Sequence, residues 1–296
     1  MLDNSLKSVL DEQKISDALR VNITQKLGDR ERVYAIGDHC DIRKEHSRKL
    51  ENIGKVRDLK GNLTNGYTTL GTVIVDENKK DITLADITVF SNKEKRFVSQ
   101  AEIKAYESGE IEDESRVLAI KELVESNNHI NMTLSVREQT QRVSQALKAN
   151  NDKLSICHVH DRFCDSVGYF EHIDQTLKDE FVVRVKLSRN SNEKRVDANG
   201  KSHSIKLIDT NFANKKTYII DKLRLKGKLY QQAKVLIEWD SVTLNEKVYS
   251  VVRITLKNRD GEAIHKKPML LITNIKAYLS TQLPNQSPLS QRVHFS

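Results

Sequence analysis

The stretch from Gly66 to Phe90 reads GYTTLGTVIVDENKKDITLADITVF and decides the fold class. Two runs rich in threonine, valine and isoleucine flank the polar turn DENKKD at 76–81. This pattern predicts two antiparallel strands joined as a β-hairpin. The earlier run RVYAIGD at 32–38 predicts one more strand ahead of the hairpin.

The segments after the hairpin alternate between helical and strand patterns. They are two helices near 114–128 and 136–150, a strand at 153–161, a helix at 166–180 and a strand at 181–189. A hairpin meander that leads into strand–helix alternation predicts an α/β fold, in which helices flank the faces of a mixed sheet.

A change of pattern between 190 and 267 predicts an inserted antiparallel β subdomain, because short β-like runs replace the helices. The run PMLLITNI at 268–275 then returns to a buried-strand pattern. The predicted domains are a short helical N-terminal segment at 1–30, the first part of the core at 31–189, the β-rich insertion at 190–267, a strand and helix start that rejoin the core at 268–281, and an irregular tail at 282–296.

The tail QLPNQSPLSQRVHFS holds two of the three prolines and has neither lysine nor acidic residues. This composition fits an irregular chain end, and it also fits a frameshifted or truncated coding sequence.

Positive charge concentrates in one part of the chain. The formal net charge is +8, and residues 181–267 hold 20 Lys and Arg against 9 Asp and Glu. That segment therefore carries +11, and the other 29 basic and 32 acidic residues carry −3. Such a distribution predicts a surface for a polyanion, most often nucleic acid, although solvated lysines on strands would give the same count.

Composition also indicates the cellular compartment in which the protein is expected. No run approaches the roughly 18–20 apolar residues of a membrane span, and the N-terminal residues show no secretory signal pattern. Three cysteines do not make a disulfide framework and fit a reducing environment. We therefore expect a cytoplasmic protein with no membrane partner.

Two carboxylates stand at the ends of predicted strands. Asp38 closes the strand in YAIGDHCDIRK, and Asp161 closes the strand in CHVHDRFCD. Strand-end carboxylates from neighbouring strands can share Mg²⁺, which prefers oxygen ligands. Two metal ions at such a site activate a nucleophile and stabilise the leaving oxygen of a phosphodiester. The alternative is that each aspartate only caps a turn.

A zinc site is the other interpretation of CHVHDRFCD. Cys157, His158, His160 and Cys164 are close in sequence, but Cys157 and His158 point to opposite faces of a strand. The spacing matches no common structural zinc pattern. Cys164 as a nucleophile has no assignable base. Packing around Asp161 is the favoured role of these residues.

Three motifs resemble the DDE transposases of bacterial insertion sequences, in the IS-four-like group with a β insertion in a ribonuclease-H-like core. They are YAIGDHCDIRK, GKVRDLKGNLTNGY and HDRFCD, and the resemblance covers roughly 31–281. Asp161 opens an Asp-Arg-Glu-x-Asp-like motif in which Phe163 replaces the glutamate. Asp38 begins an Asp-x-Thr-like motif with Cys40 in place of threonine, and Asp41 is the runner-up for the same role.

The resemblance implies metal-dependent DNA cleavage and strand transfer at insertion-sequence ends. Asp38 and Asp161 would hold Mg²⁺ or Mn²⁺. The implied partners are transposon ends and target DNA, bound by a homodimer associated with the bacterial nucleoid. Arg162 would lie near the scissile phosphate or form a salt bridge with Asp165. The candidate DNA-binding residues are Arg162, Arg184, Lys186, Arg189, Lys226 and Lys228.

One departure from the family matters for activity. The family's third ligand is a glutamate in a Tyr-x2-Arg-x3-Glu-x6-Lys signature, but Tyr278 is followed by the tail without any glutamate. We therefore expect a C-terminally truncated chain that binds DNA but cleaves it weakly, with one sheet face partly uncovered. The alternatives are a non-enzymatic DNA-binding remnant that inhibits full-length transposase, and an independent two-aspartate nuclease.

Overall fold

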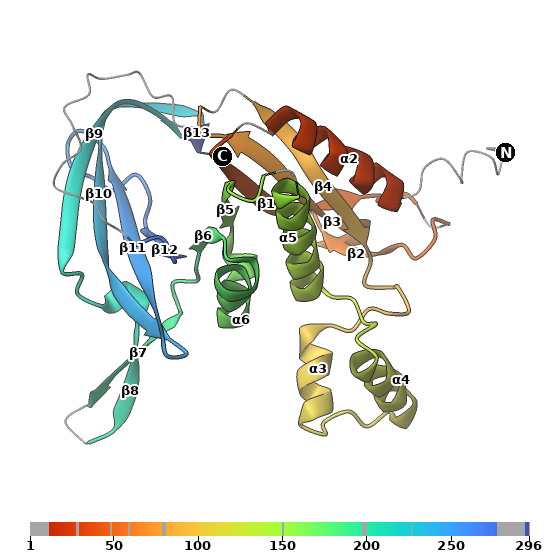
Figure 1. Cartoon of the computed structure of the whole chain (residues 1–296). Helices are drawn as coiled ribbons and strands as arrows, with labels where there is room; N and C mark the ends of the chain where they lie inside the picture. The colour runs from red at the N-terminus through yellow and green to blue at the C-terminus, as the bar shows by residue number, and fades with distance from the viewer. Residues whose placement is uncertain are drawn as a thin grey trace. The chain divides into compact units, whose positions relative to one another are not determined.

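The structure is a computed structural model that divides into two compact units, Met1–Phe163 and Cys164–Ser296. It describes residues 12–27, 30–47, 49–58, 60–78, 81–149, 151–196, 200–225, 227–276 and 294–295. Both units contain helices and strands (Figure 1), so the α/β class is confirmed.

The first unit contains a mixed sheet centred on β1 (Arg32–Arg43). This strand pairs antiparallel with β3 (Leu63–Asp76) on one side and parallel with β5 (Ser155–His160) on the other. The short strand β2 (Gly54–Arg57) and the longer β4 (Ile82–Phe90) pair with different parts of β3. The predicted hairpin around 76–81 is confirmed.

One face of this sheet is covered by α2 (Glu12–Leu27) and α5 (Met132–Lys148), as Figure 1 shows. Their apolar residues form the core with alternate residues of the strands. The buried members are Ile23, Leu27, Val33, Ala35, Ile74, Ala85, Val143, Leu147, Leu154 and Ile156. The helices predicted near 114–128 and 136–150 are confirmed as α4 (Glu114–Glu125) and α5, whereas the short helix α3 (Gln100–Glu107) was not predicted.

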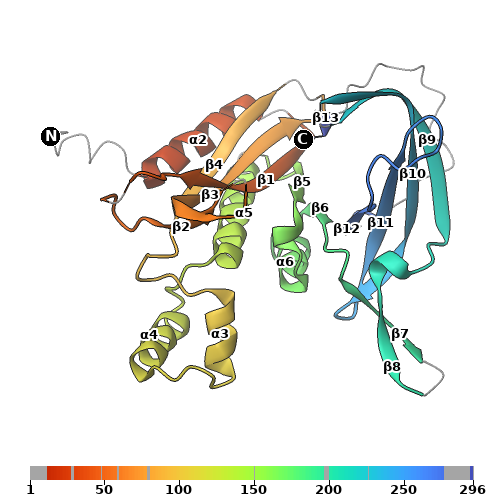
Figure 2. The same ribbon diagram turned by 180° about the vertical axis from the view of Figure 1, so that it is seen from behind.

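The opposite face of the sheet lies in front of α5 in Figure 2. Ile36 and Leu84 are each 37% exposed, and Ile82 is 68% exposed. These apolar side chains on that face are thus partly exposed, whereas the segment whose loss was expected to uncover a sheet face lies outside the described residues.

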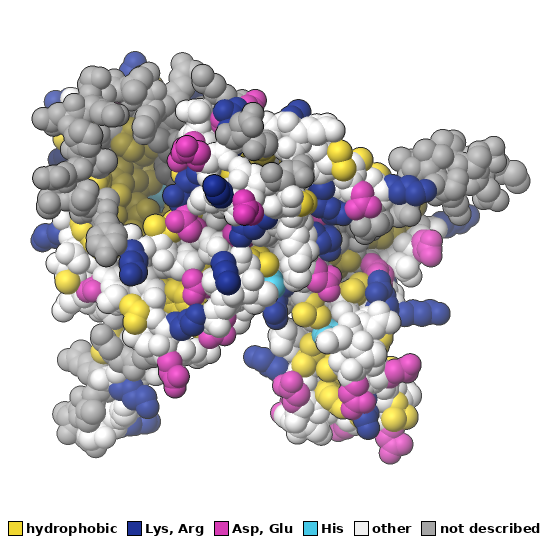
Figure 3. Space-filling view, viewed as in Figure 1, with side chains coloured by type: hydrophobic (Ala, Val, Ile, Leu, Met, Phe, Trp, Pro, Cys, Tyr) yellow, Lys and Arg dark blue, Asp and Glu magenta, His cyan; other side chains and the backbone are white. Residues whose placement is uncertain are grey.

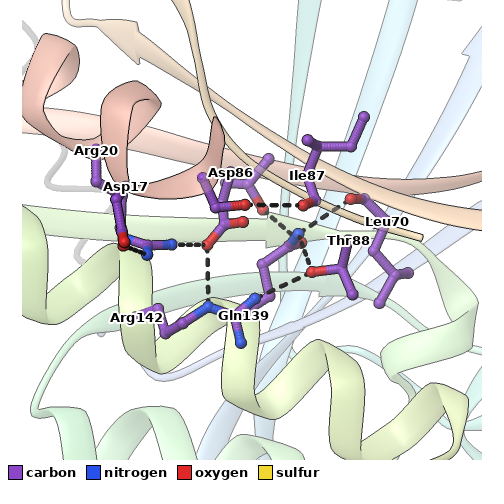
Figure 4. Close-up of polar contacts among 10 residues, drawn as sticks. Asp17, Arg20, Leu70, Asp86, Ile87, Thr88, Gln139 and Arg142 are labelled. Atoms are coloured by element: carbon purple, nitrogen blue, oxygen red, sulfur yellow. Dashed lines mark hydrogen bonds and ion pairs between the residues drawn. The ribbon is translucent and has the colours of Figure 1, made fainter. Parts of the chain in front are cut away.

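A buried ionic network fastens the two helices to the sheet (Figure 4). Asp86 on β4 is fully buried, and its Oδ2 accepts from Arg20 Nη1 of α2 at 2.7 Å and from Arg142 Nε of α5 at 3.1 Å. Gln139 adds a bond from its Nε2 to the carbonyl oxygen of Leu70 at 3.0 Å. This network fixes the position of the helical layer over β3 and β4.

The second unit is dominated by antiparallel strands. Their order is β6 (Glu180–Arg184), β12 (Met269–Thr273), β11 (Lys247–Lys257), β10 (Lys228–Leu244) and β9 (Asn214–Leu225), with β13 (His294–Phe295) parallel to β9. A separate hairpin is formed by β7 (Asn190–Val196) and β8 (Ser202–Lys206). The β-rich character predicted for 190–267 and the strand predicted within 268–275 are confirmed.

Helical structure in this unit is short. It consists of α6 (Val167–Glu171), the π-helix η2 (His172–Leu177) and the 3₁₀ turn η3 (Leu207–Asp209). The predicted helix start within 268–281 and most of the tail 282–296 lie outside the described residues. Among the helices that the structure describes, none is long and apolar enough to cross a membrane.

Candidate metal centre on two neighbouring parallel strands

Asp161 directly follows β5, as predicted, whereas Asp38 does not close its strand: β1 continues to Arg43 because it stays paired with β3, and Asp38 is opposite Gly71. In the register of β1 and β5, Gly37 is opposite His160. Asp38 and Asp161 are the next residues on each strand, so the register brings them to equivalent positions. Neighbouring strands lie about 4.8 Å apart. The register therefore brings the two aspartates to neighbouring backbone positions at the point where β5 ends and β1 continues.

Both carboxylates have access to solvent. The side chain of Asp38 is 78% exposed, and its Oδ1 accepts a hydrogen bond of 2.8 Å from the backbone N–H of His39. The side chain of Asp161 is 37% exposed, and its Oδ1 lies 3.8 Å from Arg162 Nε. Two accessible carboxylates on neighbouring strands suit Mg²⁺, which often uses one or two carboxylates and completes its shell with waters and substrate phosphates.

A glycine and a buried histidine hold the two strands together just inside the aspartates. A Cβ atom on Gly37 would lie 2.3 Å from Cε1 of His160, so only glycine fits. Burial, together with the charge of nearby His158, lowers the pKa of His160 to about 3. The imidazole is therefore neutral, and it packs against the backbone of β1 as an uncharged ring. Neither Gly37 nor this contact was predicted, although a glycine inside a strand often signals close approach.

Phe163 links the segments that follow the two strands. Its ring centroid lies 4.8 Å from that of His39 and 6.1 Å from that of His160, edge-on in both cases. Such aromatic contacts contribute about 0.5–1.5 kcal/mol beyond burial. Phe163 thus packs against the residue after Asp38 and the residue before Asp161. Sequence reasoning marked Phe163 only as a departure from the motif.

The zinc interpretation gains no support from the geometry. Cys157 pairs in register with Tyr34 and His158 with Ala35, so Cys157 and His158 lie on opposite faces of β5. Cys164 is buried in the 3₁₀ turn η1 (Arg162–Cys164). Within the described part of the chain, no group of three or more His, Cys, Asp or Glu residues is arranged to hold a metal ion.

The runner-up ligand, Asp41, has other partners. Its Oδ1 accepts from the Thr68 hydroxyl at 3.2 Å, and its Oδ2 accepts from the backbone N–H of Arg57 at 3.3 Å. These bonds tie β1 to β2 and β3. Asp41 therefore stabilises that part of the sheet, whereas Asp38 stands opposite the end of β5.

The predicted DNA-binding residues differ in their surroundings. Arg189 forms an ion pair with Asp165 and lies over the Phe170 ring at 5.3 Å, with 14% of its side chain exposed. Asp165 Oδ2 also accepts the backbone N–H of Lys186 at 2.8 Å. Asp165 is therefore the partner of Arg189, and this pair stabilises the turn after β6.

The remaining candidates are more accessible or not described. Arg162 is exposed beside Asp161, Lys186 is exposed after β6, and Lys228 is exposed at the start of β10. Arg184 is half-buried on β6, and Lys226 lies outside the described residues.

Comparisons with known proteins add no relative. A scan against models of protein families finds no match, and a search of curated proteins finds no match either.

Proposed function

We propose that this chain is a DNA-processing protein of the DDE transposase type, with a ribonuclease-H-like core in which Asp38 and Asp161 hold Mg²⁺. The observation that carries the proposal is the parallel register of β1 and β5, in which Gly37 is opposite His160. That register favours a shared site over two independent turn caps.

The element order supports the fold assignment within this proposal. A central strand pairs with an antiparallel hairpin on one side and with a parallel strand on the other, and α2 and α5 cover one face. The β-rich region between 190 and 267 corresponds to the family's insertion.

The chain's own residues would act by binding and orientation. The carboxylates of Asp38 and Asp161 would fix the metal ions where β5 ends beside β1, and the exposed guanidinium of Arg162 would contact a phosphate oxygen next to Asp161. When bound, Mg²⁺ supplies activation of the attacking oxygen and stabilisation of the leaving oxygen. Neutral His160 and Phe163 would keep the two strand ends at a constant separation.

We expect this chain to bind DNA but to cleave it only weakly. The family's third ligand is a glutamate beyond the strand that rejoins the core, and this sequence holds no Asp or Glu after Glu262. Two ligands leave the metal geometry less constrained, so cleavage is expected to be weak. If cleavage is absent altogether, the chain would be a non-enzymatic DNA-binding protein that inhibits full-length transposase.

The test is a nicking and binding experiment with the full chain. Labelled duplex DNA that carries an insertion-sequence end is incubated with Mg²⁺ or Mn²⁺, and binding is measured by fluorescence anisotropy. We expect salt-dependent binding in all variants and weak nicking that is lost in Asp38→Asn and Asp161→Asn. The control Asp17→Asn, which removes an exposed carboxylate on α2, should keep the same activity as the parent.

Two outcomes would count against the proposal. Failure of the parent chain to bind DNA would remove its basis, and nicking that survives both aspartate substitutions would place the active site elsewhere. Robust nicking that is lost when either aspartate is replaced would support the location of the site but contradict the expectation that cleavage is weak.

A further inference from the structure

The strand that carries Asp38 continues into a basic lobe formed by residues 41–60. β1 extends to Arg43 and pairs there with β3, and β2 lies on the other side of β3's first residues. The lobe has 7 Lys and Arg against 4 Asp and Glu, a balance of +3. This concentration lies outside the basic segment 181–267 and was not anticipated.

A cavity of about 700 Å³ opens on this lobe. It is lined by Asp41, Arg43, Lys44, Glu45, His46 and Ser47. The rise of about 3.4 Å per residue puts Arg43 about 17 Å along β1 from Asp38. The cavity is therefore near the candidate metal centre but separate from it.

The loop that forms the cavity is held in place by Asn65. The Lys44 backbone N–H donates to the Asn65 carbonyl at 2.7 Å, and Asn65 Nδ2 donates to the Ser47 carbonyl at 2.7 Å. Lys55 Nζ donates to Asn65 Oδ1, also at 2.7 Å. Ligand binding to a loop fixed in this way loses little conformational entropy.

Close strand packing forms the base of the lobe. A Cβ atom on Gly66 would lie 2.4 Å from the Ile42 carbonyl oxygen and 2.5 Å from Val56 Cγ2. β1, β2 and β3 therefore approach one another here only because residue 66 has no side chain. The lobe is a built part of the sheet, and three of its cations, Arg43, Lys55 and Arg57, lie on paired strands.

The charged side chains that line the cavity differ in the contacts that they already make. The Asp41 carboxylate already accepts bonds from Thr68 and Arg57. Arg43 and Lys44 are exposed, and neither forms an ion pair within the described part of the chain. Glu45 is the exposed carboxylate that opposes them. The lining thus holds two cations and two carboxylates, of which Asp41 is held to the sheet by its hydrogen bonds, and the lobe around the cavity carries +3.

We propose that this cavity binds a backbone phosphate of duplex DNA several nucleotides from the bond at Asp38 and Asp161. This inference rests on the proposed function, and it specifies where the substrate strand runs. One strand presents a phosphate for about every 3.4 Å of helix axis, so a duplex that contacts both sites would present several phosphates between them. The guanidinium of Arg43 matches the geometry of phosphate oxygens, and the ammonium of Lys44 adds a point charge.

The test is the salt dependence of DNA binding by the full chain. In the double variant Arg43→Ala/Lys44→Ala, the slope of log affinity against log salt should become shallower by about 1 to 2. The matched control is Lys104→Ala/Lys121→Ala, which removes the same charge from exposed positions on α3 and α4. The control should leave the slope near that of the parent, and thermal unfolding should show that both double variants fold.

A third variant is expected to strengthen DNA binding rather than weaken it. Glu45→Gln removes the opposing carboxylate and should tighten DNA binding about two- to fivefold. If the parent binds DNA but the Arg43/Lys44 variant behaves like the control, the cavity is not a phosphate site and the proposed function still stands. If the parent does not bind DNA, both the proposed function and this inference fail.

Discussion

Gly37 and His160 determine how closely β1 and β5 approach beneath the two aspartates. The imidazole occupies the space that any side chain at residue 37 would need. His160 is buried, so it has little room to move away from a new methyl group. The candidate metal centre therefore depends on one residue that has no side chain at all.

We predict that Gly37→Ala destabilises the protein by about 1–3 kcal/mol, because overpacking forces strain on buried neighbours. The matched control is Gly71→Ala on β3, opposite Asp38, where a Cβ atom would have open space. Chemical denaturation should separate the two variants. Equal stability of the two would show that the His160 contact is not tight.

The positions of the two candidate ligands could be predicted from the sequence, whereas the contacts of the residues packed around them could not. The positions of Asp38 and Asp161 follow from two apolar runs that end in an acid. The packing of Phe163 against His39 and His160 depends on contacts between distant segments, which no local pattern encodes. The pairing of Asp165 with Arg189 was missed for the same reason.

At the scale of elements, α2 and α5 are held to β4 by buried charges as well as by apolar packing. Asp86 is the shared partner of Arg20 and Arg142 (Figure 4). Removing one member of a buried ion pair leaves charge without compensation in a medium of low dielectric constant.

We expect Asp86→Asn to lower the free energy of unfolding by about 3–5 kcal/mol. Asp17→Asn is the control, because Asp17 also pairs with Arg20 but is 56% exposed, and its loss should cost at most about 1 kcal/mol. Urea denaturation measures both. A small effect of Asp86→Asn would mean that the two arginines find water or other partners.

A second ion pair joins β10 and β11. Glu238 accepts two hydrogen bonds from Arg253, at 2.8 and 2.9 Å. Hydrogen bonding from Arg253 lowers the pKa of Glu238 against the opposing effect of burial, and the charges of Arg253, Lys215 and Lys257 lower it further. The folded state therefore favours the ionised carboxylate.

The pH dependence follows from the lowered pKa of Glu238. Its stabilising contribution should be complete above the unfolded value of about 4.5 and should disappear as pH falls through the folded value. Glu238→Gln should cost about 1–3 kcal/mol at neutral pH, and the difference from the parent should shrink in acid. Glu246→Gln, in the turn after β10, is the control. A difference independent of pH would contradict the ionic origin.

Element prediction succeeded where apolar periodicity is strong and failed where it is weak. The strand predicted at 32–38 continues to Arg43, but the continuation is mostly polar and is held by pairing with β3. The helix α3 has no buried residue, so it gives no amphipathic pattern. Its one signal was the capping box of Ser99 and Glu102.

For the whole molecule, the charge distribution has functional meaning beyond the basic region at 181–267. The lobe at 41–60 carries positive charge on the same strand as Asp38. When net charge is summed over a long stretch of sequence, the positive charge of this lobe is hidden, because the acidic residues of α3, α4 and their connection offset it. Its position became evident only from the pairing of β1, β2 and β3.

The central claim is that Asp38 and Asp161 share divalent metal, and Mn²⁺ binding to the full chain tests it most directly. Binding is measured by electron paramagnetic resonance in the parent, in Asp38→Asn, in Asp161→Asn and in the double variant. Residues that share one site are not additive. We therefore predict that either single substitution removes the bound Mn²⁺ and that the double variant loses no more. Single variants that each retain the parent's Mn²⁺ affinity would contradict the account.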